Sequence, residues 1–251
     1  MDSNILTLFI FILGSVFASF ACVAADRCMR NDDWLSIDRS HCTACGKKLS
    51  VLELIPIFSY LYQRGKCRTC GAKIPAECFF SELSLAVLWS AAFVFYGLNE
   101  KTLVFSVMSF FLLFHALTDR KEGNIYVTWG YAGIIAIILA RFCFCGIGEI
   151  TYYLFSAAVG YSIIYIVNFF YGEAMGEGDA YLLASAGGAF GLKYLYFFLL
   201  IGILILLFEA AVRWMKDRNR NILGEPAPFA PALYIGSLPA LWITANTFLK
   251  M

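Results

Sequence analysis

Eight apolar runs, most of them long enough for a membrane-spanning helix, dominate this chain of 251 residues. A helix needs about 20 apolar residues to cross roughly 30 Å of hydrocarbon. Only 15% of the residues are charged, against about a quarter in soluble domains. We therefore expect an all-α polytopic membrane protein with about eight transmembrane helices, at residues 4–25, 79–98, 102–118, 125–145, 150–171, 179–192, 194–214 and 227–249.

The distribution of Lys and Arg predicts the orientation of these helices. With the N-terminus outside, the segments on the inner side contain 15 of the 19 Lys and Arg residues. Cytoplasmic loops of membrane proteins carry such an excess. This topology divides the chain into a first transmembrane helix (1–25), a cytoplasmic insert (26–78) and a transmembrane core (79–251).

Two pairs of cysteines in the insert have the spacing of a zinc ribbon. They are Cys42-Thr43-Ala44-Cys45 and Cys67-Arg68-Thr69-Cys70, separated by 21 residues and each followed by a glycine. Two such pairs offer four thiolates to one tetrahedral ion. Disulfides are an alternative, which a reducing cytoplasm disfavours. A redox motif is another, but it normally comes as a single pair near a βαβ pattern, which is absent here. We expect a structural zinc ion, with no open position for catalysis, at Cys42, Cys45, Cys67 and Cys70.

Two aspartates stand at the ends of apolar runs on the predicted cytoplasmic side. Asp119 follows the run 102–118, and Asp179 follows Gly176-Glu177-Gly178. Taken alone, Asp119 is an ordinary interfacial charge and Asp179 a helix N-cap. Carboxylates in membrane spans are costly, however, and two neighbouring carboxylates can share a proton. The pair suggests an intramembrane aspartyl peptidase with a flexible substrate loop at Gly176, Glu177 and Gly178.

His115 lies one helical turn before Asp119, so the two side chains share a helix face. The imidazole could orient the Asp119 carboxylate or hydrogen-bond a backbone carbonyl, and the second interpretation is favoured.

Other classes of protein remain as alternatives. A proton- or cation-coupled transporter could use the same carboxylates, but it predicts acids nearer the membrane midplane and an internal repeat. A zinc-bearing assembly protein without catalysis is a third interpretation. No feature indicates nucleic acid as a partner, and the sequence does not determine the oligomeric state.

These features resemble the type IV prepilin leader peptidases, membrane aspartyl peptidases with a Gly-x-Gly-Asp motif. The resemblance runs along nearly the whole chain. It rests on the two cysteine pairs and on the segments 14–19, 53–61, 64–68, 74–75, 82–83, 175–179, 182–184 and 228–231.

The resemblance implies that Asp119 and Asp179 are the catalytic dyad of an aspartic endopeptidase in the bacterial inner membrane. Its substrates would be prepilins or pseudopilins, cut after a short basic leader at the cytoplasmic boundary of the bilayer. Members with the four-cysteine insert are usually bifunctional, and they also methylate the new N-terminus with S-adenosylmethionine. Nothing in the sequence identifies the residues that would bind this methyl donor.

Two departures from the family pattern concern the neighbourhood of the aspartates. Tyr181 stands two residues after Asp179, where the family usually has lysine. The segment Asn124-Ile125-Tyr126-Val127-Thr128 lacks the proline that usually follows the first aspartate. Neither departure removes a carboxylate. Both bear instead on substrate choice and on the electrostatics around the two aspartates.

Overall fold

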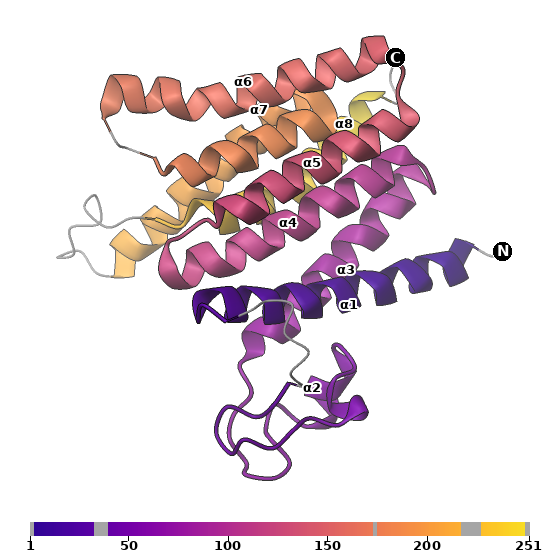
Figure 1. Ribbon diagram of the computed structural model, residues 1–251, viewed down its shortest axis with the longest axis vertical. Helices are drawn as coiled ribbons and strands as arrows, with labels where there is room; N and C mark the ends of the chain where they lie inside the picture. Colours follow the sequence, from indigo (N-terminus) through magenta and orange to yellow (C-terminus); the bar gives the residue numbers. More distant parts are fainter. Residues whose placement is uncertain (1–2, 33–39, 173–174, 217–226, 249–251) are drawn as a thin grey trace. The chain divides into compact units, whose positions relative to one another are not determined.

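The computed structural model describes residues 3–32, 40–172, 175–216 and 227–248 (Figure 1). Helices dominate these residues, and within them β structure is limited to two isolated bridges, His41 with Lys48 and Lys66 with Lys73. The chain forms two compact units, residues 1–94 and 95–251. The predicted all-α fold class is confirmed.

The first unit consists of two long helices and the insert between them. The insert contains a turn of 3-10 helix and one short α-helix. The elements are α1 (Ser3–Met29), η1 (Val51–Glu53), α2 (Phe58–Tyr62) and α3 (Ala76–Tyr96), of which the last two residues belong to the second unit.

The helices α1 and α3 approach each other closely at Gly14. A β-carbon at this position would lie 2.8 Å from the Cα of Ala86. Nearby, the rings of Phe17 and Trp89 pack with their centroids 5.2 Å apart. Small residues let helix backbones approach in apolar surroundings, where van der Waals packing drives association.

The second unit is a bundle in which α4 is the most enclosed helix, packed against α5, α7 and α8. Asn99 begins α4, because its Oδ1 accepts hydrogen bonds from the backbone N–H groups of Lys101 (3.0 Å) and Thr102 (3.2 Å). Figure 1 shows the bundle helices lying side by side: α4 (Glu100–Glu122), α5 (Val127–Phe144), α6 (Ile147–Tyr171), α7 (Glu177–Lys216) and α8 (Phe229–Phe248).

The long helix α7 reverses direction at Gly191. This residue has φ 80° and ψ −175°, a conformation that glycine adopts without steric cost. The first half starts near Asp179, whose charge interacts with that of Asp119. The second half ends near Arg213, which lines one pocket together with Arg120. Both ends of α7 therefore lie beside the last turn of α4.

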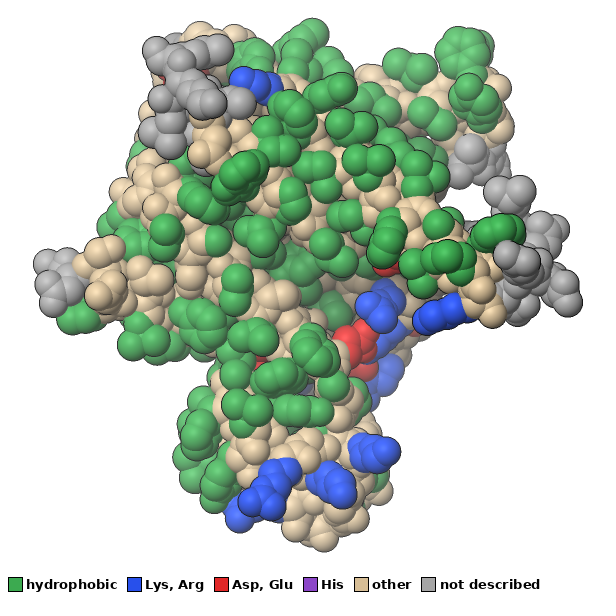
Figure 2. Space-filling model, turned by 180° about the vertical axis from the view of Figure 1, so that it is seen from behind, with side chains coloured by type: hydrophobic (Ala, Val, Ile, Leu, Met, Phe, Trp, Pro, Cys, Tyr) green, Lys and Arg blue, Asp and Glu red, His purple; other side chains and the backbone are tan. Residues whose placement is uncertain are grey.

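The described helices match the predicted membrane spans. Six are long and apolar enough to cross a membrane, and α8 is a shorter apolar helix. Because α7 consists of two antiparallel halves, each of the eight predicted runs falls on a helix or on one half of α7, with an overhang of about two residues or fewer at its ends. Residue 249 of the last run lies outside the described residues. Figure 2 shows hydrophobic side chains over the surface of the helices and Lys and Arg side chains on the insert. These features are those of a multi-pass membrane protein.

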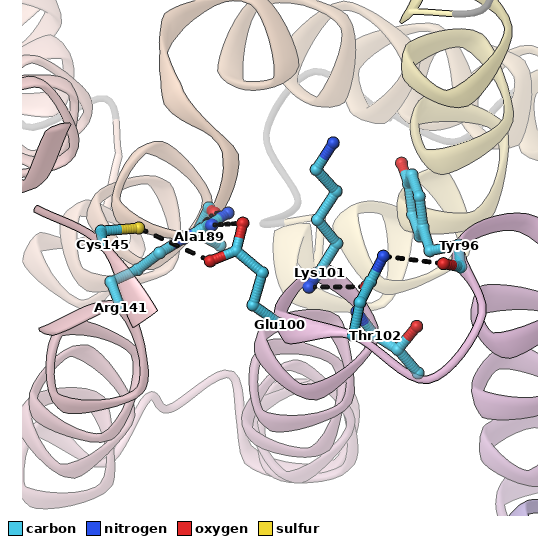
Figure 3. Close-up of polar contacts among 8 residues, drawn as sticks. Tyr96, Glu100, Lys101, Thr102, Arg141, Cys145 and Ala189 are labelled. Atoms are coloured by element: carbon cyan, nitrogen blue, oxygen red, sulfur yellow. Dashed lines mark hydrogen bonds and ion pairs between the residues drawn. The ribbon is translucent and has the colours of Figure 1, made fainter. Parts of the chain in front are cut away.

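A buried arginine holds the reversal of α7 in place (Figure 3). Only 1% of the Arg141 side chain is exposed. Its Nε donates to the carbonyl oxygen of Ala189 at 2.9 Å, its Nη2 donates to the same oxygen, and its Nη1 lies 3.4 Å from Glu100 Oε1. The guanidinium also stacks on the ring of Tyr153, 4.1 Å from the centroid. Since the last carbonyls of a helix lack intrahelical partners, Arg141 caps the first half of α7.

Candidate active site and metal site

Asp119 lies in the last turn of α4 because Gly123 ends that helix. Gly123 has φ 65°, and its N–H donates to the Asp119 carbonyl at 2.8 Å. The Asp119 side chain is buried, and its Oδ2 accepts a hydrogen bond from the Ala230 N–H at 2.9 Å. The N–H of Phe229 also donates to this carboxylate. The first N–H groups of a helix have no intrahelical partners, so the N-terminus of α8 binds the Asp119 carboxylate.

Asp179 lies in the first turn of α7 and is buried to the same degree. Its backbone N–H donates to the carbonyl of Gly176 at 3.1 Å, and its carboxylate accepts a hydrogen bond from the Gly176 backbone. The charges of Asp179 and Asp119 interact. The structure thus places two buried carboxylates from different helices at one end of the bundle, and the interaction between their like charges disfavours simultaneous ionisation.

The two glycines before Asp179 have different surroundings. A β-carbon at Gly178 would lie 2.5 Å from Ile125 Cβ, so only glycine fits there without movement of its neighbour. A β-carbon at Gly176 would meet only Asp179 Oδ2, at 3.7 Å. The side chain of Glu177 between them is exposed. Gly178 therefore permits close packing against the α4–α5 connection, and Gly176 leaves space beside a carboxylate.

Asn168 on α6 fixes the backbone that leads into this loop. Its Nδ2 donates to the carbonyl of Met175 at 2.9 Å, and its Oδ1 accepts from the Met175 N–H at 3.0 Å. The sequence offered only one signal for this role, a polar amide inside an apolar run. The amide and the backbone that it holds are seven residues apart, and their meeting depends on where α6 ends.

His115 is 1% exposed, and neither ring nitrogen has a hydrogen-bond partner within the described residues. The expectation that this imidazole binds a backbone carbonyl is therefore wrong. Tyr181, at the position that departs from the family pattern, directs its hydroxyl to that of Tyr131 on α5 at 3.3 Å. Tyr131 is 51% exposed, so this neutral hydroxyl pair lies at the edge of the bundle.

The four cysteines of the insert converge on one point. Their Sγ atoms all lie within 4.8 Å of one another, and those of Cys42 and Cys70 are 3.9 Å apart. Both pairs have the same turn, in which Gly46 N–H donates to the Cys42 carbonyl and Gly71 N–H to the Cys67 carbonyl. Sulfurs around a tetrahedral zinc ion are about 3.8 Å apart, given Zn–S bonds of about 2.3 Å. The four side chains could therefore hold one metal ion.

Backbone hydrogen bonds in the insert favour the thiolate, which is the form of cysteine that binds metals. The backbone N–H of Cys70 lowers the pKa of the Cys67 thiol to about 6. The backbone N–H of Cys45 lowers the pKa of the Cys42 thiol in the same way. The N–H groups of both turns therefore point toward the sulfurs, as they would around a bound cation.

Glu53 ties the turn η1 to the first cysteine pair. Its carboxylate accepts hydrogen bonds from the Ser50 N–H, the Ser50 hydroxyl and Lys47 Nζ, each at 2.9 Å. These donors, the Ser50 N–H first, hold the pKa of Glu53 at about 2. At neutral pH the carboxylate is thus charged and has hydrogen-bond donors for both of its oxygens.

Two family models match the chain in succession. The model described as the bacterial peptidase A24 N-terminal domain matches residues 12–96. The model described as the type IV leader peptidase family matches residues 106–210, a range that includes Asp119 and Asp179. None of the solved structures matches the chain.

Proteins of similar sequence bear one name, prepilin leader peptidase/N-methyltransferase. The protein from Bacillus subtilis (strain 168) is 31% identical over 241 residues, which cover 92% of both chains. The protein from Myxococcus xanthus (strain DK1622) is 30% identical over 90% of this chain and 70% of its own length. That from Aeromonas hydrophila is 31% identical over 83% and 73%. The chain belongs to the type IV leader peptidase family.

Proposed function

We propose that this protein removes the leader peptide from prepilins or pseudopilins and then methylates the new N-terminal amine. The proposal is supported by the names of the relatives, whose similarity extends over most of the chain. The observation that carries it is the meeting of Asp119 and Asp179, two buried carboxylates at one end of the bundle. The transporter interpretation has no such support.

In the proposed cleavage, the two carboxylates share one proton. The ionised partner accepts a proton from a water molecule, which attacks the scissile carbonyl carbon. The protonated partner donates its proton to the carbonyl oxygen, and the carboxyl group that took a proton from water then donates that proton to the leaving amine. The pair titrates as a unit, so no separate proton affinity belongs to either residue. The N–H groups at the start of α8 hold Asp119 in place throughout the reaction.

The substrate loop fits a positively charged leader. Glu177 is exposed next to the buried Asp179, so a basic peptide would be drawn toward the dyad. In the predicted topology this end of the bundle faces the cytoplasm, and the N-terminus of the chain lies outside. Gly176, which leaves space beside Asp179, would let the peptide backbone approach the carboxylates closely.

The four-cysteine site is proposed to hold structural zinc. Four thiolates complete a tetrahedral shell, so no coordination position remains for a substrate or water. A small insert gains folding free energy from such an ion. The methyl donor of the second reaction is proposed to be S-adenosylmethionine.

The test is a cleavage assay in membranes. The chain is co-expressed with a prepilin that carries a Lys-rich leader, and leader removal and the N-terminal mass are measured. Asp119→Asn and Asp179→Asn are each expected to abolish cleavage at normal protein levels. The control is Glu149→Gln, an exposed acid in the first turn of α6, which is expected to cleave normally. Cleavage that survives either aspartate substitution would refute the dyad.

A further inference from the structure

A pocket lies between Arg120 at the end of α4, the end of α7 and the segment that begins α8. It has a volume of about 550 Å³, within the range of roughly 300–1,000 Å³ that small-molecule sites occupy. The residues that line it are Arg120, Phe208, Glu209, Val212, Arg213, Pro228 and Pro231. All of them belong to the second unit.

The charged side chains of the pocket complement an amino-acid zwitterion. Arg213 and Glu209 lie one helical turn apart on α7, with Nη2 3.6 Å from Oε2. Arg120 adds a second guanidinium, and it has no ion-pair partner among the described residues. Guanidinium groups bind carboxylates through parallel hydrogen bonds, and a carboxylate such as Glu209 accepts hydrogen bonds from an ammonium group.

The remaining walls are apolar. Phe208 and Val212 come from the last turns of α7, and Pro228 and Pro231 flank the first residues of α8. The Phe208 side chain is 70% exposed, so its ring is available to a ligand. Apolar and aromatic walls with a few convergent polar groups are typical of small-molecule and cofactor sites.

The pocket also lies where the second reaction needs a methyl donor. Arg120 follows Asp119 in the chain, and Pro228 and Pro231 bracket Ala230, whose N–H binds the Asp119 carboxylate. Peptide cleavage at the dyad releases an amine at this place. A ligand in the pocket would therefore lie next to the newly formed N-terminus.

We propose that this pocket binds S-adenosylmethionine, with Arg213 and Arg120 on its carboxylate, Glu209 on its ammonium and Phe208 beside its adenine. The inference rests on the proposed function, because the donor is needed only for methylation. In that reaction the amine nitrogen forms a bond to the methyl carbon, the C–S electron pair stays on sulfur, and the amine releases a proton to water.

Charge separates this site from the one for the leader peptide. Two arginines and one glutamate give the pocket a positive balance, which repels a basic leader. The exposed Glu177 of the substrate loop attracts such a leader instead. An anionic phospholipid headgroup could also pair with arginines at a membrane surface, and the experiment below distinguishes it from the methyl donor.

The test measures the binding of radiolabelled S-adenosylmethionine to the purified full-length protein in detergent. Arg213→Met is expected to weaken binding at least tenfold, and Arg213→Lys to weaken it less. Glu209→Gln is a second probe, expected to weaken binding at least fivefold, and it serves if Arg213→Met fails to fold. The control is Lys216→Met, which removes the same charge three residues further along α7, outside the pocket.

Prepilin cleavage by the same preparation of unsubstituted protein separates this inference from the proposed function. Absent cleavage would refute the function. Normal cleavage without donor binding would overturn the pocket assignment and the proposed methylation, and it would leave the proposed peptidase activity standing. The pocket assignment would also be overturned if Arg213→Met bound the donor as well as the unsubstituted protein does. If Arg213→Met instead lost co-purified anionic phospholipid while its donor binding persisted, the pocket would be a lipid site and the assignment would be overturned.

Discussion

The carboxylate of Asp119 and the backbone N–H of Ala230 join the end of α4 to the start of α8 across 111 residues of sequence. The donor belongs to the backbone, so a residue at position 230 that is no larger than the buried alanine leaves it intact. Proline removes the donor, because it has no N–H, and proline is tolerated in the first turn of a helix.

Ala230→Pro is therefore expected to lower kcat/KM for prepilin cleavage by about tenfold or more, since a hydrogen bond to a charged group contributes roughly 1.5–3 kcal/mol. Ala230→Gly keeps the N–H and is expected to remain close to the activity of the unsubstituted protein. Cleavage kinetics of both purified variants provide the measurement. Equal activity in the proline and glycine variants would show that the contact does not matter to the reaction.

Substitution by alanine should affect cleavage differently at Gly176 and Gly178. Gly178→Ala places a methyl group 2.5 Å from Ile125 Cβ, and overpacking of this kind costs about 1–3 kcal/mol. We expect a loss of cleavage of about tenfold. Gly176→Ala meets only an ordinary contact at 3.7 Å and should have the smaller effect. The reverse order in a cleavage assay would contradict the packing observed at Gly178.

Arg141 is expected to stabilise the bundle rather than to take part in chemistry. Arg141→Met leaves the Ala189 carbonyl and Glu100 without the guanidinium, and a buried acceptor left without its donor costs about 1–3 kcal/mol. Thermal unfolding in detergent should occur at a clearly lower temperature. In a double-mutant cycle with Glu100→Gln, the coupling should exceed about 0.5 kcal/mol. Additive effects of the two substitutions would argue against the pair.

The insert is expected to bind zinc, and removal of the zinc is expected to unfold the insert. Purified protein is expected to contain zinc, and a strong chelator should make the insert sensitive to protease. Cys42→Ser and Cys67→Ser should lose the metal. Cys143→Ser changes an exposed cysteine of the second unit and should retain it. Full zinc content in the Cys67→Ser variant, measured by elemental analysis, would exclude the four-thiolate site.

The lowered pKa of Glu53 predicts how the stability of the insert changes in acid. Its pKa is about 2 when folded, below the ordinary value of 4.5. The charged form is thus favoured by folding, and this stabilisation is complete above about pH 4.5 and disappears as pH falls toward 2. Protection of the insert from an acid-active protease should decline over this window. Glu53→Gln should begin less protected at pH 7 and lose less protection between pH 4.5 and pH 2.

Much of the fold could be predicted from the sequence, because the length of an apolar run and the charges beside it determine whether that segment spans a membrane. The runs 179–192 and 194–214 anticipate the two halves of α7, since Gly191 and its neighbours interrupt the apolar pattern. The spacing of the cysteine pairs likewise anticipates the convergence of their sulfurs. Both predictions depend on residues within one segment.

The supporting contacts of the site could not be predicted in this way. The N–H of Ala230 and the carbonyl of Met175 are backbone groups, which carry no signal in a sequence. Arg141 lies in the predicted span 125–145, and nothing in that span indicates that its side chain is buried against the Ala189 carbonyl at the break in α7. Such pairings follow from where helices end in space.

The most direct test of the central claim is whether Asp119 and Asp179 act as one catalytic unit. Cleavage rates of purified Asp119→Asn, Asp179→Asn and the double variant answer this, because residues that share one chemical step have strongly non-additive effects. We expect each single substitution to lower kcat/KM by at least about a thousandfold, with no further loss in the double variant. A double variant whose loss is the product of the two single losses would contradict the account, as would a single variant that retains substantial activity.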